Sequence, residues 1–508
     1  MGPARYHCAM LLWNGFPIIT AIAGRILVRP NSHHLCTMLR TFIRISPSSL
    51  RLTRPIRRCA QRSYATSYIS PSSRYETYHG GQIKTYYNST LTGLSPAENE
   101  FREAVWEFSA RVVQPKVAAI EREGGDTETH EYKTLVEVHK EMAEMGLHGV
   151  TVPTEDLTSS LGLGLSYTHH LLAMEAISYS SASLALSYGA HSNLCVNQLS
   201  RWGSDEQRAQ WIPGLLDGTY IGALAMSETG AGSDVLGSMR TVAKKVDDGY
   251  VLNGNKFWIT NGPKADVFIV YARDVVEPGA KQTFTTFLVP RTTPGFSTGK
   301  PLDKFGMRGS PTCELIFEDV FLPSTAVLGD PASLQGKGAK VLMSGLDLER
   351  LVLSGGPLGI MQAAYDTAVE YVHQREQFGV PVATIGSMQA KLADMYTKVN
   401  TARTFVYAVA RAVDGHNAEA QIQGLGPKDK GYTYPPFQRR DCAAAIMYAT
   451  DKAIEVAMEC MQCLGGNGYI NDYPAARYLA DARLYAVGAG TQEVRRWLIG
   501  REVNSDFE

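Results

Sequence analysis

The sequence predicts an α+β protein in which a helical segment, an antiparallel β segment and a second helical segment follow one another. Apolar residues recur at helical spacing near residue 100 and again from residue 336 onward. Between these parts, the chain carries β-branched and aromatic runs bounded by Gly, Pro and Asn. With 508 residues, 44% of them hydrophobic, the chain has room for about three domains of ~150 residues each.

The first helical segment is predicted as a domain over residues 94–219. Ser95 and Glu98 form the pattern of a capping box, in which each side chain satisfies a backbone N–H at the start of a helix. Apolar residues then follow at the spacing of one helical face: Phe101, Val105, Phe108 and Val112.

The remaining two segments are predicted to divide at about residue 334. Within 220–334, strand composition predicts an antiparallel β domain, with its clearest runs at 249–252, 267–271 and 285–289. Within 335–508, the apolar periodicity predicts helices over 339–375, 387–413, 440–464 and 478–500. Residues 414–438 contain several Gly and Pro, which predicts a long surface loop.

The first 64 residues have the composition of a mitochondrial transit peptide. From Met1 to Tyr75 there are eleven Arg and no Lys, and the first carboxylate is Glu76. Arg-rich, acid-poor leaders are typical of import into the mitochondrial matrix. We therefore expect residues 1–64 to be removed, and residues 65–93 to form a flexible N-terminus of the mature protein. The alternative is a basic tail that binds nucleic acid or a membrane surface.

Charge and hydropathy weigh against nucleic-acid and membrane partners. The net charge is −1 for the whole chain and −11 beyond residue 64, because ten arginines lie in the leader. A nucleic-acid binder needs a basic face instead. The apolar stretch 8–28 is interrupted by Asn14, Pro17 and Arg25, so we expect no membrane span.

The cysteine pattern does not predict a metal site. Cys460 and Cys463 form the only close pair among eight cysteines. They lie in an apolar helical run, and no second pair or His set completes a zinc site. We expect thiols buried in the core.

The clearest candidate for chemistry is Glu349, a carboxylate on an apolar helical stripe. Its neighbours three, four and seven residues away include Leu342, Leu346, Val352 and Leu353. A carboxylate on such a stripe either pairs with a distant Arg or Lys in the core or remains uncharged with a raised pKa. The first alternative makes Glu349 structural, and the second makes it a general base tuned towards neutral pH.

Four short motifs have residues suited to an anion or a planar ring. The small residues of 226–233 let backbone N–H groups approach an anion, although a surface turn has the same composition. Trp258 and Thr260 are suited to stacking on a planar ring and hydrogen-bonding to it. The other two motifs, 462–469 and 488–493, are each also typical of a helix end.

Together these motifs, ordered between residues 224 and 493, resemble those of the flavin-dependent acyl-CoA dehydrogenases. The resemblance covers about residues 95–505 and implies an N-terminal helical domain, a middle antiparallel β domain and a C-terminal four-helix-bundle domain. It implies FAD as cofactor, an acyl-CoA thioester as substrate and an electron-transfer flavoprotein as partner. By resemblance, the flavin contacts are Leu224, Ala225, Met226, Ser227, Gly232, Ser233, Trp258, Ile259, Thr260, Thr491, Gln492 and Glu493.

A second set of flavin contacts is implied to come from a neighbouring subunit. By resemblance, these residues reach the FAD of the partner: Arg375, Gln462, Cys463, Leu464, Gly465 and Gly466. The implied assembly is a homotetramer built as a dimer of dimers.

The family's usual catalytic carboxylate is missing from this chain. Most members carry Tyr-Glu-Gly-Thr where this chain has Gly488-Ala489-Gly490-Thr491. Glu349 stands where the members acting on isovaleryl-CoA and on long chains place their base, so the resemblance implies that Glu349 is the catalytic residue. Implied substrate contacts are Ser233, Asp347, Leu348, Arg350, Leu353, Gly488, Ala489 and Gly490, with Leu186 and Ala190 as further walls.

The resemblance implies FAD-dependent α,β-dehydrogenation of a short branched acyl-CoA. The expected reaction converts isovaleryl-CoA to 3-methylcrotonyl-CoA in leucine catabolism. Gly488, in place of the usual Tyr, leaves room for a chain branched at carbon 3. The alternatives are another branched- or long-chain acyl-CoA dehydrogenase, and a flavin-bearing binding protein without catalysis.

Overall fold

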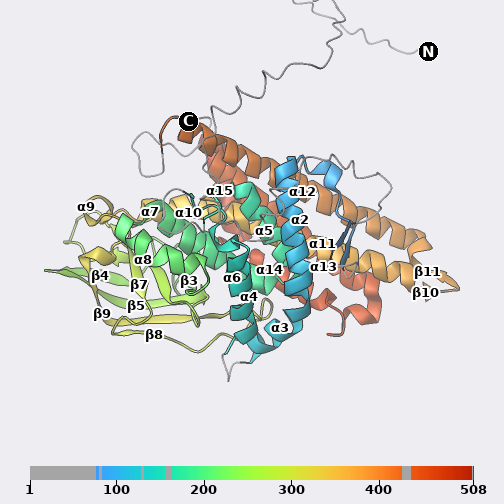
Figure 1. Cartoon of the computed structure of the whole chain (residues 1–508), viewed down its shortest axis with the longest axis horizontal. Helices are drawn as coiled ribbons and strands as arrows, with labels where there is room; N and C mark the ends of the chain where they lie inside the picture. Colours follow the sequence, from blue (N-terminus) through green and yellow to red (C-terminus); the bar gives the residue numbers. More distant parts are fainter. Residues whose placement is uncertain are drawn as a thin grey trace, which may run out of the picture. The chain divides into compact units, whose positions relative to one another are not determined.

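The computed structural model describes residues 76–78, 83–126, 131–154, 162–425, 436–505 and 507. All of these residues belong to one compact unit (Figure 1). The predicted transit peptide 1–64 lies outside them, as does most of the expected flexible segment 65–93. None of the described helices is long and apolar enough to cross a bilayer.

The N-terminal part is helical, as predicted. Its helices are α2 (Pro96–Phe108), α3 (Val117–Gly125), α4 (Lys133–Glu144), α5 (Tyr167–Ser180), α6 (Ala182–Gly189), α7 (Asn197–Trp202) and α8 (Asp205–Leu216). The capping box that opens α2 is confirmed, because Ser95 N donates to Glu98 Oε2 at 2.6 Å and Glu98 N donates to Ser95 Oγ at 3.3 Å. A π-helical turn, Ala190–Val196, continues α6 without a break.

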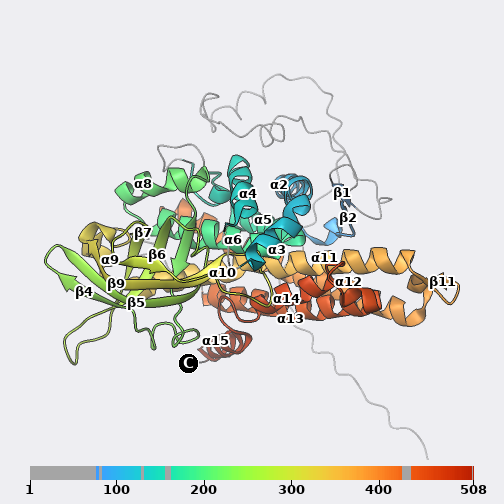
Figure 2. The same ribbon diagram turned by 90° about the horizontal axis from the view of Figure 1, so that it is seen from below.

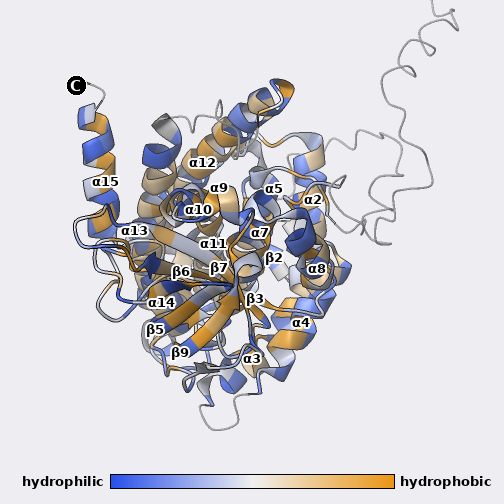
Figure 3. Ribbon diagram, turned by 90° about the vertical axis from the view of Figure 1, so that its left-hand side faces the viewer, coloured by the Kyte–Doolittle hydropathy of each residue, from blue (hydrophilic) through white to orange (hydrophobic). Residues whose placement is uncertain are grey.

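The middle part contains a seven-stranded sheet. Its strands are β3 (Gly222–Ala225), β4 (Val242–Val246), β5 (Gly249–Thr260), β6 (Val267–Asp274), β7 (Phe284–Pro290), β8 (Phe296–Thr298) and β9 (Thr312–Pro323). The strand order is β3-β6-β4-β5-β9-β8, with β7 paired to β6. Most pairs are antiparallel, as predicted, but β3 and β4 each run parallel to β6. The strands β3 and β9 are mostly apolar in Figure 3, whereas α15 at the surface is largely polar.

The C-terminal part is again helical. It comprises α9 (Pro331–Leu334), α10 (Gly338–Leu353), α11 (Gly355–Gln374), α12 (Gly386–Ile422), α13 (Pro436–Leu464), α14 (Ala475–Tyr485) and α15 (Gln492–Ser505). The long helices α11, α12 and α13 pack against one another, and α10 packs on α13 (Figure 2). Two short hairpins complete the fold: β1 (Glu76–Tyr78) with β2 (Ile83–Thr85), and β10 (Glu376–Gln377) with β11 (Val380–Pro381).

Three expectations from the sequence require correction. The predicted loop 414–438 is shorter than expected, because α12 continues to Ile422; residues 426–435 lie outside the described part. The segment 83–93 was expected to be flexible, but Tyr87 is 5% exposed and packs on Trp106. The helix predicted over 478–500 is two helices, because residues 486–491 leave the helical conformation.

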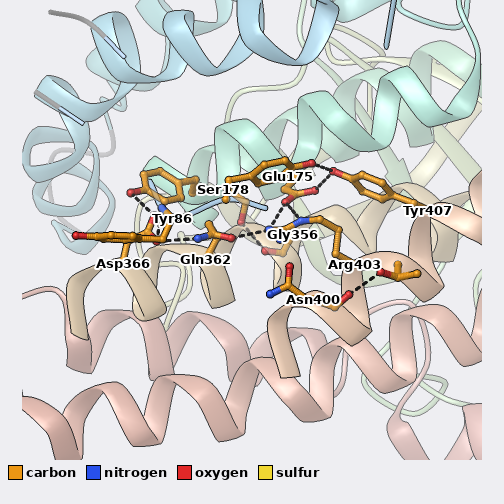
Figure 4. Close-up of polar contacts among 12 residues, drawn as sticks. Tyr86, Glu175, Ser178, Gly356, Gln362, Asp366, Asn400, Arg403 and Tyr407 are labelled. Atoms are coloured by element: carbon orange, nitrogen blue, oxygen red, sulfur yellow. Dashed lines mark hydrogen bonds and ion pairs between the residues drawn. The ribbon is translucent and has the colours of Figure 1, made fainter. Parts of the chain in front are cut away.

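A buried cluster of polar residues joins the two helical parts (Figure 4). Glu175 on α5 accepts hydrogen bonds from Arg403 Nε at 3.0 Å and from Arg403 Nη2 at 2.9 Å. Its second oxygen accepts from the Tyr407 hydroxyl at 2.7 Å. Arg403 also donates to Gln362 Oε1 on α11 at 2.8 Å. Both carboxylate oxygens of Glu175 therefore accept hydrogen bonds.

A second polar chain joins the N-terminal helices to the sheet. His139 Nε2 lies 2.9 Å from Ser187 Oγ, which donates to Asn261 Oδ1 at 2.6 Å. Asn261 Nδ2 donates to the carbonyls of Ser187 at 2.9 Å and Gly222 at 3.2 Å. Burial lowers the pKa of His139 to about 3, so this ring is neutral. One amide side chain thus connects α6, β3 and the end of β5.

Candidate active site

Glu349 lies on α10 as the sequence predicts, with its side chain inside the protein. The residue is 5% exposed, and its Oε2 atom is buried with no hydrogen-bond partner. Burial raises its pKa to about 7, against the smaller opposing effects of Arg350 and Arg495. A buried carboxyl with an unoccupied oxygen and a pKa near neutrality is suited to exchanging a proton with a ligand.

The two charged neighbours of Glu349 along the helix satisfy each other. Arg350 Nη1 donates to Asp347 Oδ1 at 3.0 Å, and both side chains are almost fully buried. Arg350 Nε also donates to the carbonyl oxygen of Ala489 at 3.4 Å. This contact brings α10 against the turn 486–491, although the two segments are far apart in sequence.

The turn between α14 and α15 therefore belongs to the same site. Ala489 has φ +56° and Gly490 has φ +94°, so two successive residues are left-handed. A Cβ atom built on Gly488 meets only Leu484, at 3.4 Å, so space is open beside this residue. Of the residues expected to contact substrate, the structure brings Asp347, Leu348, Arg350, Leu353, Gly488, Ala489 and Gly490 around Glu349 or onto this turn.

Apolar residues close the other side of α10. Leu353, one turn beyond Glu349, is 6% exposed, and a Cβ atom built on Gly189 would lie 3.3 Å from its Cδ2 atom. Leu186 and Ala190, one turn apart on α6 and its π-helical continuation, are also buried. The expected apolar walls thus lie on the element that packs against the helix of Glu349.

The residues expected to hold the flavin ring gather at the ends of β3 and β5. A bulge in β5 follows Lys256, and Trp258 within it has φ +60° and is 52% exposed. Phe257 N donates to Ser227 O at 2.9 Å, which fixes the segment after β3 beside β5. A Cβ atom on Gly232 would lie 3.8 Å from the Trp258 ring. The loop 227–233 therefore lies against this ring.

An ion pair supports that loop from inside. Lys256 Nζ lies 2.9 Å from Glu228 Oε1 and donates to Met226 O at 3.1 Å. Glu228 also accepts from the backbone N–H groups of Arg240 at 2.7 Å and Thr241 at 3.0 Å. Burial lowers the pKa of Lys256 to about 8, with Glu228 opposing the shift. The pair fixes the course of the backbone from Met226 to Gly232.

Some of the expected contacts have side chains that point away from the site surface. Ala225 and Ile259 are buried in the core of the sheet, and Cys463 and Leu464 are buried in the helical core. Gln492 Nε2 donates to Met447 O and Asp451 Oδ1 on α13. Thr491 Oγ1 accepts from Val494 N at the start of α15, next to the exposed Glu493. The side chains of these four buried residues are therefore part of the core.

Arg375 and the segment 462–466 form a separate group. Asn467 Nδ2 donates to the Tyr371 hydroxyl at 2.9 Å, so the end of α13 lies beside the end of α11. Arg375, Gln462, Gly465 and Gly466 are exposed there. Both ribbon views place this end of the helices, marked by β11, on the opposite side from β4 and β5 (Figures 1 and 2).

The surface around Trp258 fits a flavin. A half-exposed aromatic ring and an adjacent loop of small residues suit a planar ring bearing a pyrophosphate. Cβ atoms built on Gly465 and Gly466 meet nothing within 4 Å, so the second group also leaves room for a ligand. Among the described residues, no cluster of His, Cys, Asp or Glu could hold a metal ion.

Sequence reasoning missed three residues near Glu349. Arg495 on α15 is 1% exposed and donates to the carbonyls of Tyr485 and Gly488. Gln198 Nε2 donates to the Tyr271 hydroxyl at 3.2 Å, and a Cβ atom on Gly345 would collide with this amide. Burial and the charge of Glu349 contribute to a raised pKa of Tyr271. The only signal in the sequence was Gly345, one turn before Glu349.

A half-exposed Trp258 beside a loop of small residues, and a buried carboxyl group with an unoccupied oxygen, are features expected of a flavin-dependent oxidoreductase. The acyl-CoA dehydrogenase models match the chain in order: the N-terminal domain over 95–219, the middle domain over 223–320 and the C-terminal domain over 336–504. The chain belongs to the acyl-CoA dehydrogenase family, whose members are FAD-dependent oxidoreductases.

Individual relatives agree with this assignment. The mitochondrial isovaleryl-CoA dehydrogenase of Oryza sativa subsp. japonica is 48% identical over 424 residues, which cover 83% of this chain and 95% of the relative. The mitochondrial 2-methylacyl-CoA dehydrogenase of Solanum tuberosum is 46% identical over 415 residues, covering 82% and 92%. The acyl-CoA dehydrogenase of Bacillus anthracis complexed with FAD has a TM-score of 0.72 at 29% identity, covering 82% of this chain and 68% of that chain.

Proposed function

We propose that this enzyme dehydrogenates isovaleryl-CoA to 3-methylcrotonyl-CoA, with Glu349 as the catalytic base. The observation that carries the proposal is the unoccupied, buried Oε2 atom of Glu349 on a helix packed against the turn 488–490. Because Ala489 stands where most members carry the base, Glu349 is the carboxylate that can serve this turn.

The described residues divide the work of the reaction. Glu349 Oε2 accepts the α-proton of the acyl group, and the carboxyl becomes neutral, which its buried surroundings favour. The backbone N–H of Ala489 donates to the thioester carbonyl and stabilises the negative charge that develops on its oxygen. Asp347 and Arg350 hold each other beside the base and position the thioester portion of the substrate.

FAD, when bound, supplies the two-electron oxidant that takes the β-hydrogen as hydride. In this proposal, Leu224–Ser227, Gly232, Ser233 and Trp258–Thr260 of one subunit hold the flavin together with Thr491, Gln492 and Glu493. Arg375 and Gln462–Gly466 of a second subunit complete the cofactor site. We propose that the assembly is a homotetramer built as a dimer of dimers.

The site favours a short branched acyl chain. Gly488 leaves open space beside the turn, and we expect the buried Leu186, Ala190 and Leu353 to form the walls around the acyl chain. The two relatives described above are named for isovaleryl-CoA and for 2-methylacyl-CoA, both of which are branched. The position of the branch is therefore the property that an assay must resolve.

The cellular setting is proposed on the same basis. The relatives are named as mitochondrial, and the first 64 residues have the composition of a matrix-targeting leader. We place the enzyme in the mitochondrial matrix, where an electron-transfer flavoprotein reoxidises it.

The test compares four substrates with the purified, FAD-loaded enzyme and an electron-accepting dye. Isovaleryl-, 2-methylbutyryl-, isobutyryl- and butyryl-CoA are assayed for kcat/KM, and light scattering gives the subunit number. We expect isovaleryl-CoA to be preferred by about tenfold or more, since one misplaced methyl group costs ~1–3 kcal/mol. A preference for 2-methylbutyryl-CoA would reassign the substrate, and the absence of turnover with all four would refute the activity.

A further inference from the structure

The turn that carries Ala489 is held by two buried guanidinium groups. Arg495 donates to the carbonyl oxygen of Tyr485 at 2.8 Å and to that of Gly488. Arg350 donates to the next carbonyl, that of Ala489. Two successive carbonyls thus accept hydrogen bonds from two different helices, α15 and α10.

This turn needs such support because its backbone conformation is unfavourable. An L-residue such as Ala489 at φ +56° is less stable than in the right-handed region, because its Cβ atom crowds the following carbonyl oxygen. Strained residues persist where surrounding contacts determine them, and they occur often at functional sites. If the carbonyl of Gly488 is fixed, the peptide plane that it shares with the N–H of Ala489 is fixed as well.

Arg495 is itself an unusual buried charge. The side chain is 1% exposed, its Nε atom has no partner, and its nearest side-chain acceptor is the neutral amide of Gln492, at 2.7 Å from Nη1. Burial and Arg350 lower its pKa to about 10, whereas the charges of Glu349 and Asp451 oppose that shift. A buried cation without a hydrogen-bonded carboxylate is costly. Because Arg495 lies beside both the turn and Glu349, a role at this site would account for the buried charge.

We propose that Arg495 is a positioning residue that fixes the peptide between Gly488 and Ala489, so that its N–H meets the acyl carbonyl whose α-proton Glu349 removes. The inference rests on the proposed function and adds to it a residue that touches no substrate. The positive charges of Arg495 and Arg350 also favour the ionised form of Glu349 and so lower its pKa. The burial of Glu349, near Tyr271, has the larger and opposite effect.

The test compares Arg495→Met, Arg495→Lys and the matched control Arg496→Met. Arg496 is the next residue on α15, but it is exposed and pairs with Asp451 at 2.6 Å. For the Met variant we expect kcat to fall about tenfold or more with little change in KM, since one oxyanion donor is worth ~10²–10³ in kcat. The acid limb of its pH–kcat profile should shift to higher pH by roughly 0.5–1 unit, because loss of the positive charge raises the pKa of Glu349. In Arg495→Lys, kcat should fall while the acid limb stays at its wild-type pH. If Arg495→Met does not fold, Arg495→Lys alone tests the proposal.

A second readout needs no turnover. Acetoacetyl-CoA added to the FAD-loaded enzyme gives a charge-transfer band as its enolate forms, and titrating this band reports how well the site stabilises an enolate. We expect the transition to move to higher pH in both Arg495 variants and to stay unchanged in Arg496→Met.

The outcomes separate this inference from the function it rests on. If Glu349→Gln turns over isovaleryl-CoA at the wild-type rate, the proposed base is wrong. If Glu349→Gln is inactive but both Arg495 variants match Arg496→Met in kcat, acid limb and enolate titration, Arg495 has no positioning role.

Discussion

Glu349 and Glu175 are both buried carboxylates on helices, and their surroundings differ in one respect. Glu175 has both oxygens occupied, by the Arg403 guanidinium and by the Tyr407 hydroxyl. Glu349 has a buried oxygen with no partner, and its arginine neighbours donate to backbone carbonyls of the turn instead. A fully bonded carboxylate holds two domains together, whereas one with an unoccupied oxygen is available for chemistry.

The largest expected effect comes from Glu349→Gln. The amide keeps the size of the side chain but cannot accept a proton, so flavin reduction by isovaleryl-CoA should fall by ~10²–10⁴-fold. FAD content and acyl-CoA binding should remain. Stopped-flow absorbance of the flavin measures the rate.

The matched control is the same substitution in the other carboxylate. Glu175→Gln should leave the rate per bound FAD within about twofold of the wild type. A large loss of rate in Glu175→Gln, or none in Glu349→Gln, would contradict the assignment of catalysis to Glu349 and of a structural role to Glu175.

The second effect concerns stability at the other carboxylate. Glu175→Gln leaves Arg403 buried without its counter-charge, which typically costs about 3–5 kcal/mol. Denaturant unfolding of the FAD-loaded protein measures this loss. Glu175→Gln combined with Arg403→Met removes both charges and should recover much of it. Equal stability of the single and double variants would show that the ion pair is not what joins these helices.

Of the two carboxylates, the sequence predicted only the role of Glu349, because that prediction depends on the spacing of neighbouring residues. Glu349 stood out because its apolar neighbours recur with the period of a helix, and the capping box at Ser95 is equally local. Glu175 could not be recognised, because its partner Arg403 is on another helix and distant in sequence.

The interruption at residues 486–491 was missed for another reason. The apolar spacing continues across Ala489, and it does not reveal the contacts from Arg350 and Arg495 that support the left-handed conformation of this residue. The glycines at 488 and 490 were the local signal of a helix end. The family resemblance assigned this segment a role, but the geometry that supports the role came from the structure.

The third effect is a pH dependence of stability at Glu349. The folded-state pKa is about 7 against a usual value of 4.5, so folding favours the protonated carboxyl. Below pH 4.5 the carboxyl is mostly protonated in both the folded and the unfolded protein, so its ionisation costs little stability. Between pH 4.5 and about pH 7 this cost in unfolding free energy grows. Above that pH it reaches about 3 kcal/mol, at 1.36 kcal/mol per pKa unit.

Removing the ionisable group should therefore stabilise the protein at high pH only. Glu349→Gln should melt above the wild type at pH 8 and at nearly the same temperature at pH 4, as followed by calorimetry. A gain of equal size at both pH values would assign the effect to packing instead of ionisation.

The smallest expected effect is at Asp366, which shares features of both carboxylates. Burial raises its pKa to about 7, yet it accepts hydrogen bonds from Tyr86 N, Gln362 Nε2 and the Tyr179 hydroxyl. In Asp366→Asn, the Tyr179 hydroxyl can turn to accept from the new amide. We expect a loss of about 1 kcal/mol in unfolding free energy and no change in rate. A loss as large as that of Glu175→Gln would indicate that Asp366 is ionised in the folded protein.

The amide of Asn261 has a consequence for how the enzyme is assembled during synthesis. It joins α6 to the start of β3 and the end of β5, the two strands whose ends carry the proposed flavin contacts. The cofactor pocket therefore takes shape only after helices made early on the ribosome have docked onto strands made later. An inherited change at His139 or Ser187 would leave every catalytic group intact. We expect such a variant to retain less FAD after purification than the wild type, which flavin absorbance per chain would measure; equal FAD content would contradict this consequence.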